Sequence, residues 1–521
     1  MTTLKPISET KKLISDNIVR HCLIEMSAKA SVILSHFAHN QTIRELDHNL
    51  TYNPIYFAGD SFTKTPPQKW NKISPKIDKH EIIGLLPKIL LSAYITPNGI
   101  HTIQSERTIQ GQYTQTIKSS SAANYFVDLK SIDHKITHRN NMQSLQFTGG
   151  LAGFIGYDLA AYQQINQSNN HDHDKQTEQL VAAMGDYDIY LKEEEDGWAI
   201  YGPDDLELMP LYQHLTQALQ IIAAQELSNH STQPPSFQVV NPFTPVWSFD
   251  EYNHAFQRIQ QYLRAGDCYQ VNLTQPFTAQ VEGELLATLD DLLQLTQAPY
   301  SGYMKVGEHE ILSCSPELFL SFSGVQADGH NQVITRPIKG TRPRSLDAKY
   351  DEIERKTLTH SEKDHSENLM IVDLLRHDLS QHAVIGSVQV PALFAVESFA
   401  QVHHLVSEIQ ATLRPDVSAL DVLIDALPGG SITGAPKKRA MEIIAELEAM
   451  PRGAYCGSFG YLNHDGSGQF NILIRTLQKY QDNLIAWAGG GITIASNVED
   501  EYQECFDKIS AILNCVNEFQ N

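Results

Sequence analysis

One lysine lies in a short segment that is rich in arginine. The stretch VITRPIKGTRPRS, residues 333–345, carries Lys339 together with Arg336, Arg342 and Arg344. Four cations so close together repel one another unless an anion binds among them. The segment therefore predicts an anion site, against the alternative of a basic surface loop.

Two pairs of acidic residues form a second candidate site. Asp364 and Glu367, like Glu501 and Glu504, are spaced i, i+3 within segments of helical apolar periodicity. Each pair therefore shares one face of a helix. Four carboxylates from two helices can hold Mg²⁺, which prefers oxygen ligands and keeps positions open for water or substrate. For either pair alone, a solvated helix face is the commoner explanation.

Three side chains are candidates for substrate contact: His404 in VHHLVSEI, Tyr455 in RGAYCG and Arg475 in ILIRTL. A single histidine or tyrosine is more often a core residue. Arg475 interrupts a strand-like run, and an inward guanidinium can bind a carboxylate through two parallel hydrogen bonds. The segment PGGSITGAPK resembles the first half of a phosphate loop but lacks its lysine and hydroxyl, so a nucleotide site is not expected.

The apolar patterns of the C-terminal half predict an α+β fold. A run with helical spacing ends at Gly266 and is followed by a strand-like run. Residues 456–492 contain three alternating runs separated by turn residues, which predicts an antiparallel meander. The apolar residues of the expected helix are Tyr252, Phe256, Ile259 and Leu263.

Two polar segments, residues 167–179 and 227–236, are expected to be surface loops. The second suggests a division into an N-terminal region, residues 1–235, and a catalytic domain, residues 236–521. Within the N-terminal region, residues 147–162 (FTGGLAGFIGYDLAAY) predict a buried, glycine-rich strand.

Composition limits the possible partners and location. The chain has 61 acidic and 39 basic residues, a net charge of −22, which argues against general affinity for nucleic acid or anionic membranes. We find no signal peptide and no run of about 20 apolar residues, so a cytoplasmic protein without a membrane span is expected. The six cysteines lack CxxC spacing, which favours free thiols over disulfides or a structural metal.

These motifs together resemble the chorismate-utilising enzymes. The resemblance covers residues 245–515 in order, through GDCYQVNL, SPELF, RPIKGTRPR, ENLMIVDLLRHDL, VHHLVSEI, PGGSITGAPKKRAMEII, YCGSFGYL, IRTL, AGGGI and EYQECFDK. It implies an α/β sandwich of large mixed, mainly antiparallel sheets with chorismate and Mg²⁺ in a central cleft. Members that form anthranilate have alanine where this chain has Lys339, and those that form isochorismate or salicylate have a lysine where it has Gln270. The resemblance therefore implies the branch that makes 4-amino-4-deoxychorismate, the precursor of 4-aminobenzoate and folate.

The resemblance also implies a role for each candidate residue. Lys339 would attack C2 of chorismate, and ammonia would then attack C4 and expel the lysine. Glu317 would protonate the departing C4 hydroxyl. Glu367 and Glu504 would bind Mg²⁺ directly, with Asp364 and Glu501 behind them. The residues expected to line the ring and hold the enolpyruvyl carboxylate are Thr341, His404, Tyr455, Arg475, Gly489, Gly490 and Gly491.

The ammonia source is not visible in the chain, which lacks the cysteine turn of a glutamine amidotransferase. A separate amidotransferase subunit is therefore the expected partner, with free ammonia as a substitute. A tryptophan pocket occurs in related enzymes around a short LLES-like segment, for which the nearest match here is VILSH at residues 32–36. Two alternatives stay open: an enzyme of the anthranilate branch, and an inactive scaffold that regulates the amidotransferase.

Overall fold

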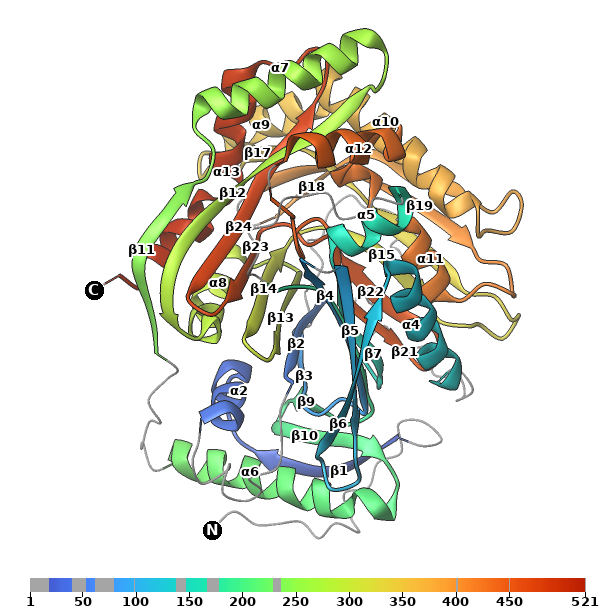
Figure 1. Ribbon diagram of the computed structural model, residues 1–521, viewed down its shortest axis with the longest axis vertical. Helices are drawn as coiled ribbons and strands as arrows, with labels where there is room; N and C mark the ends of the chain where they lie inside the picture. The colour runs from blue at the N-terminus through green and yellow to red at the C-terminus, as the bar shows by residue number, and fades with distance from the viewer. Residues whose placement is uncertain are drawn as a thin grey trace.

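The computed structural model describes residues 18–39, 53–60, 79–97, 99–136, 147–165, 178–227, 236–399, 402–448 and 450–520. Two large sheets form its centre, and helices cover their outer faces (Figure 1). Every pairing between described strands is antiparallel. The predicted α+β fold with large, mainly antiparallel sheets is confirmed.

The first sheet, sheet A, has twelve described strands. Their spatial order is β1 (Ile18–Glu25), β10 (Gly197–Pro203), β9 (Tyr190–Glu194), β3 (Lys79–Gly84), β2 (Ile55–Asp60), β13 (Tyr300–Val306), β14 (His309–Ser315), β23 (Thr476–Tyr480), β24 (Asn483–Ile492), β12 (Gln270–Gly283) and β11 (Phe237–Pro245), with β20 (Gly434–Ala435) paired to β12.

The second sheet, sheet B, also has twelve described strands. Their order is β17 (Ile338–Pro343), β19 (Val402–Thr412), β16 (Gln332–Arg336), β15 (Leu318–Ser323), β22 (Ser467–Asn471), β21 (Ser458–Asn463), β7 (Gly150–Ile155), β8 (Gln179–Tyr187), β4 (Ile89–Thr96), β5 (Gly99–Arg107) and β6 (Tyr113–Ser120), with β18 (Gln389–Ser398) paired to β19.

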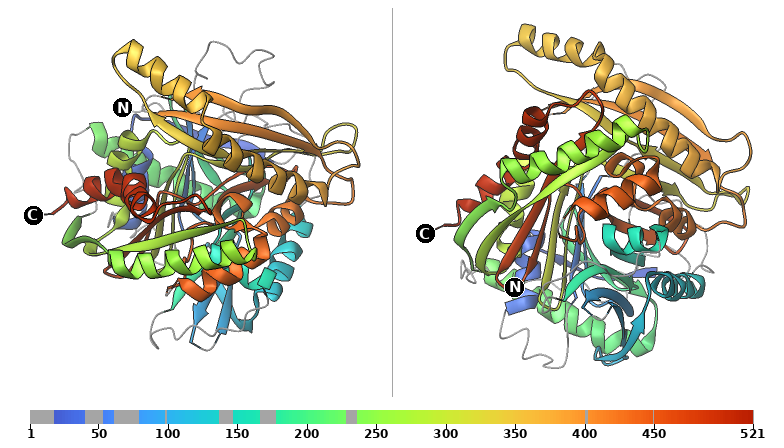
Figure 2. Two further views of the ribbon diagram at one scale, coloured as in Figure 1. Left: turned by 90° about the horizontal axis from the view of Figure 1, so that it is seen from above. Right: turned by 45° about the horizontal axis from the view of Figure 1, so that its top comes forward.

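The helices pack on both sheets. Along β17, β18 and β19 lie α9 and α10, which Figure 2 shows as one edge of the molecule. The bounds are α2 (Ala30–His39), α4 (Ala122–Ile136), α5 (Tyr157–Ile165), α6 (Met209–Leu227), α7 (Phe249–Ala265), α8 (Leu289–Thr296), α9 (Ala348–Thr359), α10 (Glu362–Ser380), α11 (Ala419–Ala426), α12 (Lys437–Leu447) and α13 (Val498–Asn517), with 3₁₀ turns η1 (Leu206–Leu208), η2 (Leu285–Thr288) and η3 (Gly430–Ile432). No helix in these described ranges is long and apolar enough to cross a membrane.

Each sheet contains strands from both sides of residue 235. In sheet A, β2 pairs with β13, and in sheet B, β7 pairs with β21. The inner faces of the two sheets pack against each other through aromatic rings, with Phe57 of β2 5.0 Å from Phe459 of β21 between ring centroids. The residues just before the proposed domain boundary at residue 235 lie outside the described ranges. The regions before and after this boundary share one hydrophobic core.

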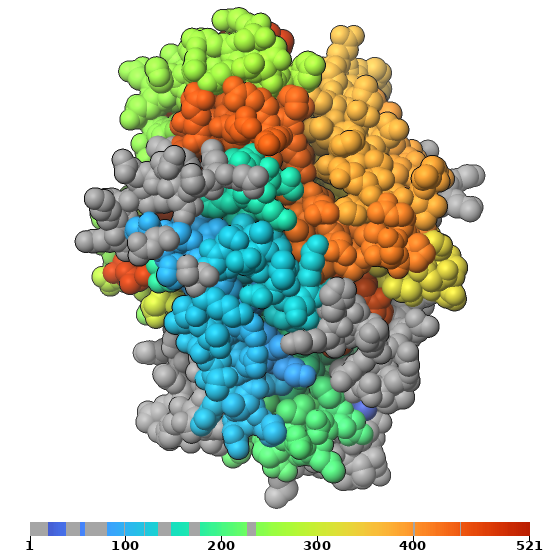
Figure 3. All heavy atoms as spheres, turned by 45° about the vertical axis from the view of Figure 1, so that its right-hand side comes forward, coloured from blue at the N-terminus to red at the C-terminus, as the bar shows by residue number. Residues whose placement is uncertain are grey.

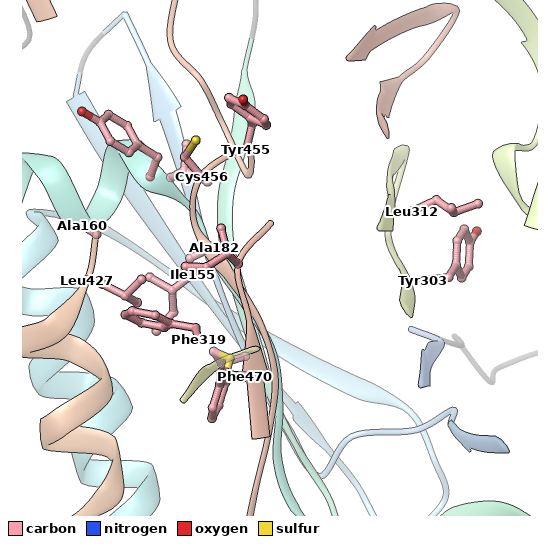
Figure 4. Close-up of a cluster of buried hydrophobic side chains, with 14 of the residues drawn as sticks. Ile155, Ala160, Ala182, Tyr303, Leu312, Phe319, Leu427, Tyr455, Cys456 and Phe470 are labelled. Carbon is pink, nitrogen blue, oxygen red and sulfur yellow. The ribbon is translucent and has the colours of Figure 1, made fainter. Parts of the chain in front are cut away.

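The buried apolar side chains also fill the space between sheet B and its helices. Figure 4 shows Ile155, Phe319, Leu427 and Phe470 gathered there, while Tyr455 lies beyond Cys456 at the edge of the group. All six cysteines are free, as predicted, and four of them are buried.

Local sequence explains several elements well. Helix α7 begins at a capping box in which Ser248 and Glu251 exchange hydrogen bonds, and it ends at Gly266 with a φ of 79°. Strand β12 follows, as the pattern predicted. Residues 147–162 are only partly a strand, because β7 ends at Ile155 and α5 begins at Tyr157.

The predicted meander is wrong in one respect. Its strands form two hairpins in different sheets, with β21 and β22 in sheet B and β23 and β24 in sheet A. Alternation of apolar and polar residues identifies a strand but not the sheet that it joins.

Candidate active site

Two segments that cross between the sheets lie side by side. One links β14 to β15 and carries Glu317, and the other links β22 to β23 and carries Arg475. The Ile472 backbone N–H donates to the Glu317 carbonyl oxygen at 3.1 Å, and Ser315 Oγ donates to the Ile472 carbonyl at 2.6 Å. The crossings therefore bring together two candidate residues that are far apart in the sequence.

Glu317 is a buried carboxylic acid, 6% exposed. Burial raises its pKa to about 7, although the positive charge of Lys339 and a hydrogen bond from the Ile338 backbone act to lower it. A carboxyl group with a pKa near 7 holds a proton in a large fraction of molecules at neutral pH. It can therefore donate a proton to a leaving group, which is the role that the family resemblance implies.

Lys339 lies on β17, half-buried, close to this acid. Its Nζ donates to the Ser431 carbonyl oxygen at 3.4 Å. Its positive charge also lowers the pKa of Glu317 and acts in the same direction on Glu367 and Glu504. One amine and three carboxyl groups thus form a single electrostatic cluster.

The three arginines near Lys339 do not surround it as uncompensated charges. Each one is paired with a carboxylate: Arg336 with Glu397 and Glu408, Arg342 with Asp364 at 3.0 Å, and Arg344 with Asp351 at 2.8 Å. Carboxylates of the protein itself therefore compensate the three arginines. Proximity in the sequence does not reveal partners supplied by β18, β19 and the two helices.

The acidic pairs lie on two helices, as predicted. Asp364 and Glu367 belong to α10, and Glu501 and Glu504 belong to α13. Burial raises the pKa of Glu367, and the negative charges of Asp364 and Glu504 add to the rise. The two helices therefore face each other through these carboxylates.

These residues can be compared with the requirements of Mg²⁺. No three potential ligand side chains of the described residues are close enough together to surround an ion. Two of the candidates have other partners: Glu504 is 2.5 Å from Lys508, and Asp364 pairs with Arg342. The donor set, all carboxylate oxygens, suits Mg²⁺, although Lys508 and Arg342 pair with two of these carboxylates.

A run of three glycines in β24 allows close approach to this acidic cluster. A Cβ atom on Gly490 would lie 3.0 Å from Glu501 Oε2 and 3.1 Å from Glu504 Oε1. Side chains on Gly489 or Gly491 would collide with β12, at the Leu273 carbonyl oxygen and at Gln270 Nε2. Gly489 therefore needs glycine for packing, because its neighbour is backbone, whereas at Gly490 and Gly491 the neighbouring side-chain ends would have to shift.

Thr341 and His404 are neighbours across β17 and β19. Thr341 Oγ1 and His404 Nδ1 are 2.8 Å apart, and His404 is 4% exposed. Burial lowers the pKa of His404 to about 4, and the positive charge of Arg475 lowers it further. The imidazole is therefore neutral at physiological pH and can exchange a hydrogen bond without adding charge.

Arg475 and Tyr455 lie next to the sheet crossing. Arg475 has a φ of 52°, and its half-buried guanidinium has no ion-pair partner in the described residues. Burial lowers its pKa, as expected for a cation removed from water. Tyr455 is buried, with its ring nearly parallel to Trp487 at 6.1 Å between centroids. An unpaired guanidinium in such a position favours a carboxylate ligand.

Sequence reasoning missed a buried ion pair behind the site. Arg452 donates to Glu448 from both Nε and Nη2 at 2.7 Å, and these side chains are 1% and 3% exposed. Arg452 also donates to the Ile432 and Asn272 carbonyl oxygens. The i, i+4 spacing of a glutamate and an arginine was the available signal.

The segment VILSH forms part of helix α2, which packs against α6. His36 Nε2 lies 3.0 Å from Gln225 Oε1 of α6. Tryptophan binding in this region stays a prediction.

The chain is similar in sequence and in fold to known proteins. A family model described as chorismate binding enzyme matches residues 87–514. The chain is 39% identical over 409 residues to aminodeoxychorismate synthase component 1 of Klebsiella aerogenes, covering 78% of this chain and 86% of that protein. It is 39% identical over 274 residues to anthranilate synthase component 1 of Thermus thermophilus, covering 53% and 58%. The crystal structure of anthranilate synthase component I from Streptococcus pneumoniae aligns with a TM-score of 0.65 at 24% identity, over 87% of this chain and 95% of that one, and supports the fold.

Proposed function

This chain belongs to the chorismate binding enzymes, and within that family we propose that it acts as component 1 of an aminodeoxychorismate synthase. The observation that carries the proposal is the position of Lys339 beside Glu317, a buried acid with a pKa of about 7. An amine nucleophile next to a proton donor is what two successive displacements on one ring require. The long match to a relative of that name supports it.

The first displacement uses both residues. The uncharged Lys339 nitrogen bonds to C2 of chorismate, the ring double bonds shift, and the C4 hydroxyl leaves as water with a proton from Glu317, so the bonded nitrogen becomes positively charged. In the second, ammonia bonds to C4, the double bonds shift back and the C2–N bond breaks, with its electron pair returning to the lysine nitrogen. The ammonium formed at C4 then returns a proton to Glu317. The net change replaces the C4 hydroxyl by an amino group, giving 4-amino-4-deoxychorismate and water.

Mg²⁺ is the proposed cofactor. Glu367 and Glu504 would hold it directly, with Asp364 and Glu501 behind them. Bound there, it supplies charge that orients the ring carboxylate and draws electron density from C2. Burial, together with the negative charges of Asp364 and Glu504, raises the pKa of Glu367, and this accumulation of carboxylates supports a role for a cation between α10 and α13.

The remaining candidates would hold the substrate. The Arg475 guanidinium would bind the enolpyruvyl carboxylate, with Tyr455 and the backbone of Gly489 and Gly491 beside it. The neutral His404, held by Thr341, would accept or donate a hydrogen bond at the C4 oxygen. The low pKa of His404 supports this role, because an unprotonated ring does not compete with Glu317 as the proton donor to the departing C4 hydroxyl.

Ammonia would come from a glutamine amidotransferase subunit, consistent with the component 1 name of the Klebsiella aerogenes relative. The product would serve 4-aminobenzoate and folate synthesis. The anthranilate branch is the second candidate, because the Thermus thermophilus relative is equally identical over a shorter alignment.

The test is incubation of the full chain with chorismate, MgCl₂ and ammonium chloride, followed by an aminodeoxychorismate lyase. Fluorescent 4-aminobenzoate that forms only after the lyase supports the proposal. Anthranilate formed without the lyase supports the second candidate, and no turnover supports an inactive scaffold.

The Lys339→Ala variant tests the covalent route. We expect it to bind chorismate while its product shifts toward anthranilate, because ammonia can then enter at C2. Lys349→Ala, on the exposed face of α9, is the matched control and should leave the product unchanged. An unaltered product from Lys339→Ala would exclude the lysine adduct.

A further inference from the structure

Sheet B ends at a strand that has only one neighbour among the described strands. Strand β6 pairs with β5, and the strand order of the sheet stops there. Figure 3 shows this hairpin at the surface of the molecule, in light blue. In a strand that is paired on one side, every second residue directs its backbone N–H and C=O groups outward. The outer side of β6 therefore offers a row of hydrogen-bonding groups to another strand.

The other sheet edges in the described ranges carry features that prevent such pairing. Strand β11 contains two prolines, and its Val239 N–H donates to the Phe519 carbonyl oxygen at 3.2 Å. Strand β18 contains Pro391 and two register shifts against β19. A bulge interrupts β1, whose residues 19–24 are buried or half-buried, and α9 and α10 pack along β17. Proline, bulges and covering elements are the usual means by which an edge is protected.

Strand β6 lacks each of these features. It contains no proline, and its eight residues pair with β5 without a register shift. The side chains of residues 114–118 are exposed. Its single charged side chain, Lys118, lies 3.5 Å from Asp128 of α4, which offsets the charge. The strand is thus regular, accessible and nearly neutral.

One large apolar side chain stands on this edge. Ile117 is 65% exposed, and it lies directly opposite Ile103 of β5. Ile103 in turn packs against the aromatic core between the two sheets. Because successive side chains of a strand point to opposite faces, Ile117 faces away from Lys118. Ile117 therefore extends an apolar row beyond the core, where a further apolar side chain would fit beside it.

A second copy of the same strand matches this edge. Two identical strands that pair antiparallel are related by a two-fold axis, which is the commonest symmetry of oligomers. With the axis at Ile117, this residue lies opposite its own copy, and Lys118 lies opposite Thr116 of the partner subunit. No like charges of the two strands then face each other. A row of four isoleucines, from Ile103 and Ile117 of both copies, crosses the joint.

We propose that two copies of this chain associate through antiparallel pairing of their β6 strands, which joins their B sheets into one. The inference does not rest on the proposed function, and β6 carries none of the residues assigned to chorismate or Mg²⁺. A single strand is smaller than the roughly 20–30 residues that each partner contributes to a standard stable interface. The dimer is therefore reversible, with an expected Kd on the order of 10 μM.

Sedimentation equilibrium of the full chain under reducing conditions, from about 1 to 100 μM, measures this association. We expect the average mass to rise with concentration from that of one chain toward that of two. Ile117→Lys should weaken the dimer by at least about tenfold, because two ammonium groups would lie opposite each other at the axis. The matched control is Ile109→Lys, at a 52% exposed isoleucine in the turn between β5 and β6, which should leave the Kd unchanged.

A cysteine cross-link tests the register. Directly opposite residues of antiparallel strands have Cβ atoms about 4.5–5.5 Å apart, which is near the separation in a disulfide. Ile117→Cys should therefore form a disulfide-linked dimer on oxidation. Thr114→Cys is the control, because the two copies of residue 114 would lie roughly 20 Å apart along the paired strands. The wild type, whose six cysteines are free and four of them buried, gives the background.

A chain that stays monomeric at about 100 μM would overturn the inference. A dimer that Ile117→Lys leaves as tight as the wild type, or equal cross-linking of Thr114→Cys and Ile117→Cys, would also overturn it, because either result places the contact elsewhere. A monomer whose β6 amides become protected from hydrogen exchange only when an amidotransferase subunit is added would assign the edge to that subunit instead. The cross-link keeps the test decisive if Ile117→Lys does not fold.

Discussion

Replacing Glu317 by glutamine should remove activity and stabilise the protein at alkaline pH. The two side chains have nearly the same shape, so packing at the sheet crossing is retained. Glutamine cannot donate an acidic proton, and loss of a general acid typically lowers kcat by about 10²–10⁴-fold. In the wild type, kcat should fall as the pH rises through about 7, because Glu317 then loses its proton.

The stability effect follows from the same pKa. Burial raises the pKa of Glu317 from 4.5 to about 7. Between these pH values the folded state binds more protons at Glu317 than the unfolded state does. The stabilisation that comes from the protonated Glu317 is therefore fully present below about pH 4.5, and it is lost as the pH rises through about 7. At about 1.4 kcal/mol for each pKa unit, the loss is about 3 kcal/mol. Glutamine does not titrate and should not show it.

Urea denaturation of both proteins at several pH values measures the difference. We expect the free energy of unfolding of Glu317→Gln to increase by about 3 kcal/mol relative to that of the wild type between pH 4 and pH 8, which means that the variant becomes relatively more stable. Glu282→Gln, an exposed position on β12, is the control. A relative stability of Glu317→Gln that does not change with pH would show that the buried acid is not held in its protonated form.

Three further variants test the site. Gly490→Ala brings a methyl group against the carboxylates of α13, so half-maximal activity in a titration with MgCl₂ should require about fivefold more metal. An unchanged metal requirement would show that these carboxylates do not bind the metal. Arg475→Lys loses the planar, two-pronged guanidinium and should raise the KM for chorismate by about tenfold in steady-state kinetics. A KM equal to that of the wild type would show that Arg475 does not contact the substrate. Arg452→Met leaves Glu448 buried without its partner and should lower the free energy of unfolding by about 3–5 kcal/mol in denaturant titrations; a loss below about 1 would contradict a role in stability.

The sequence predicted local structure better than it predicted which elements meet. The start and end of α7 were predictable because the capping residues and the apolar spacing act within a few residues of each other. The i, i+3 acidic pairs did fall on helices for the same reason. The split of residues 456–492 between two sheets was not predictable, since both hairpins have the same alternating pattern.

The charge environment of Lys339 was the part of the site least accessible to sequence reasoning. RPIKGTRPR suggested four cations acting together, yet Arg336, Arg342 and Arg344 each pair with a carboxylate from another element. Two of those partners are far away in the sequence: Glu397 is 61 residues from Arg336, and the second partner of Arg336, Glu408, is further still. Long-range pairs of this kind leave no local pattern, whereas the pair formed by Glu448 and Arg452 could have been read from its spacing.

The resulting charge balance supports a divalent cation in the reaction. With Glu317 protonated and Lys339 uncharged as the nucleophile, three carboxylates of α10 and α13 are balanced by two lysines and the Arg475 guanidinium. Chorismate brings two carboxylates, so its charge is uncompensated in a partly buried place, which is costly. We therefore expect a divalent cation between the two helices to remove that deficit. The charged groups counted are Arg475, Glu367, Glu501, Glu504, Lys363 and Lys508.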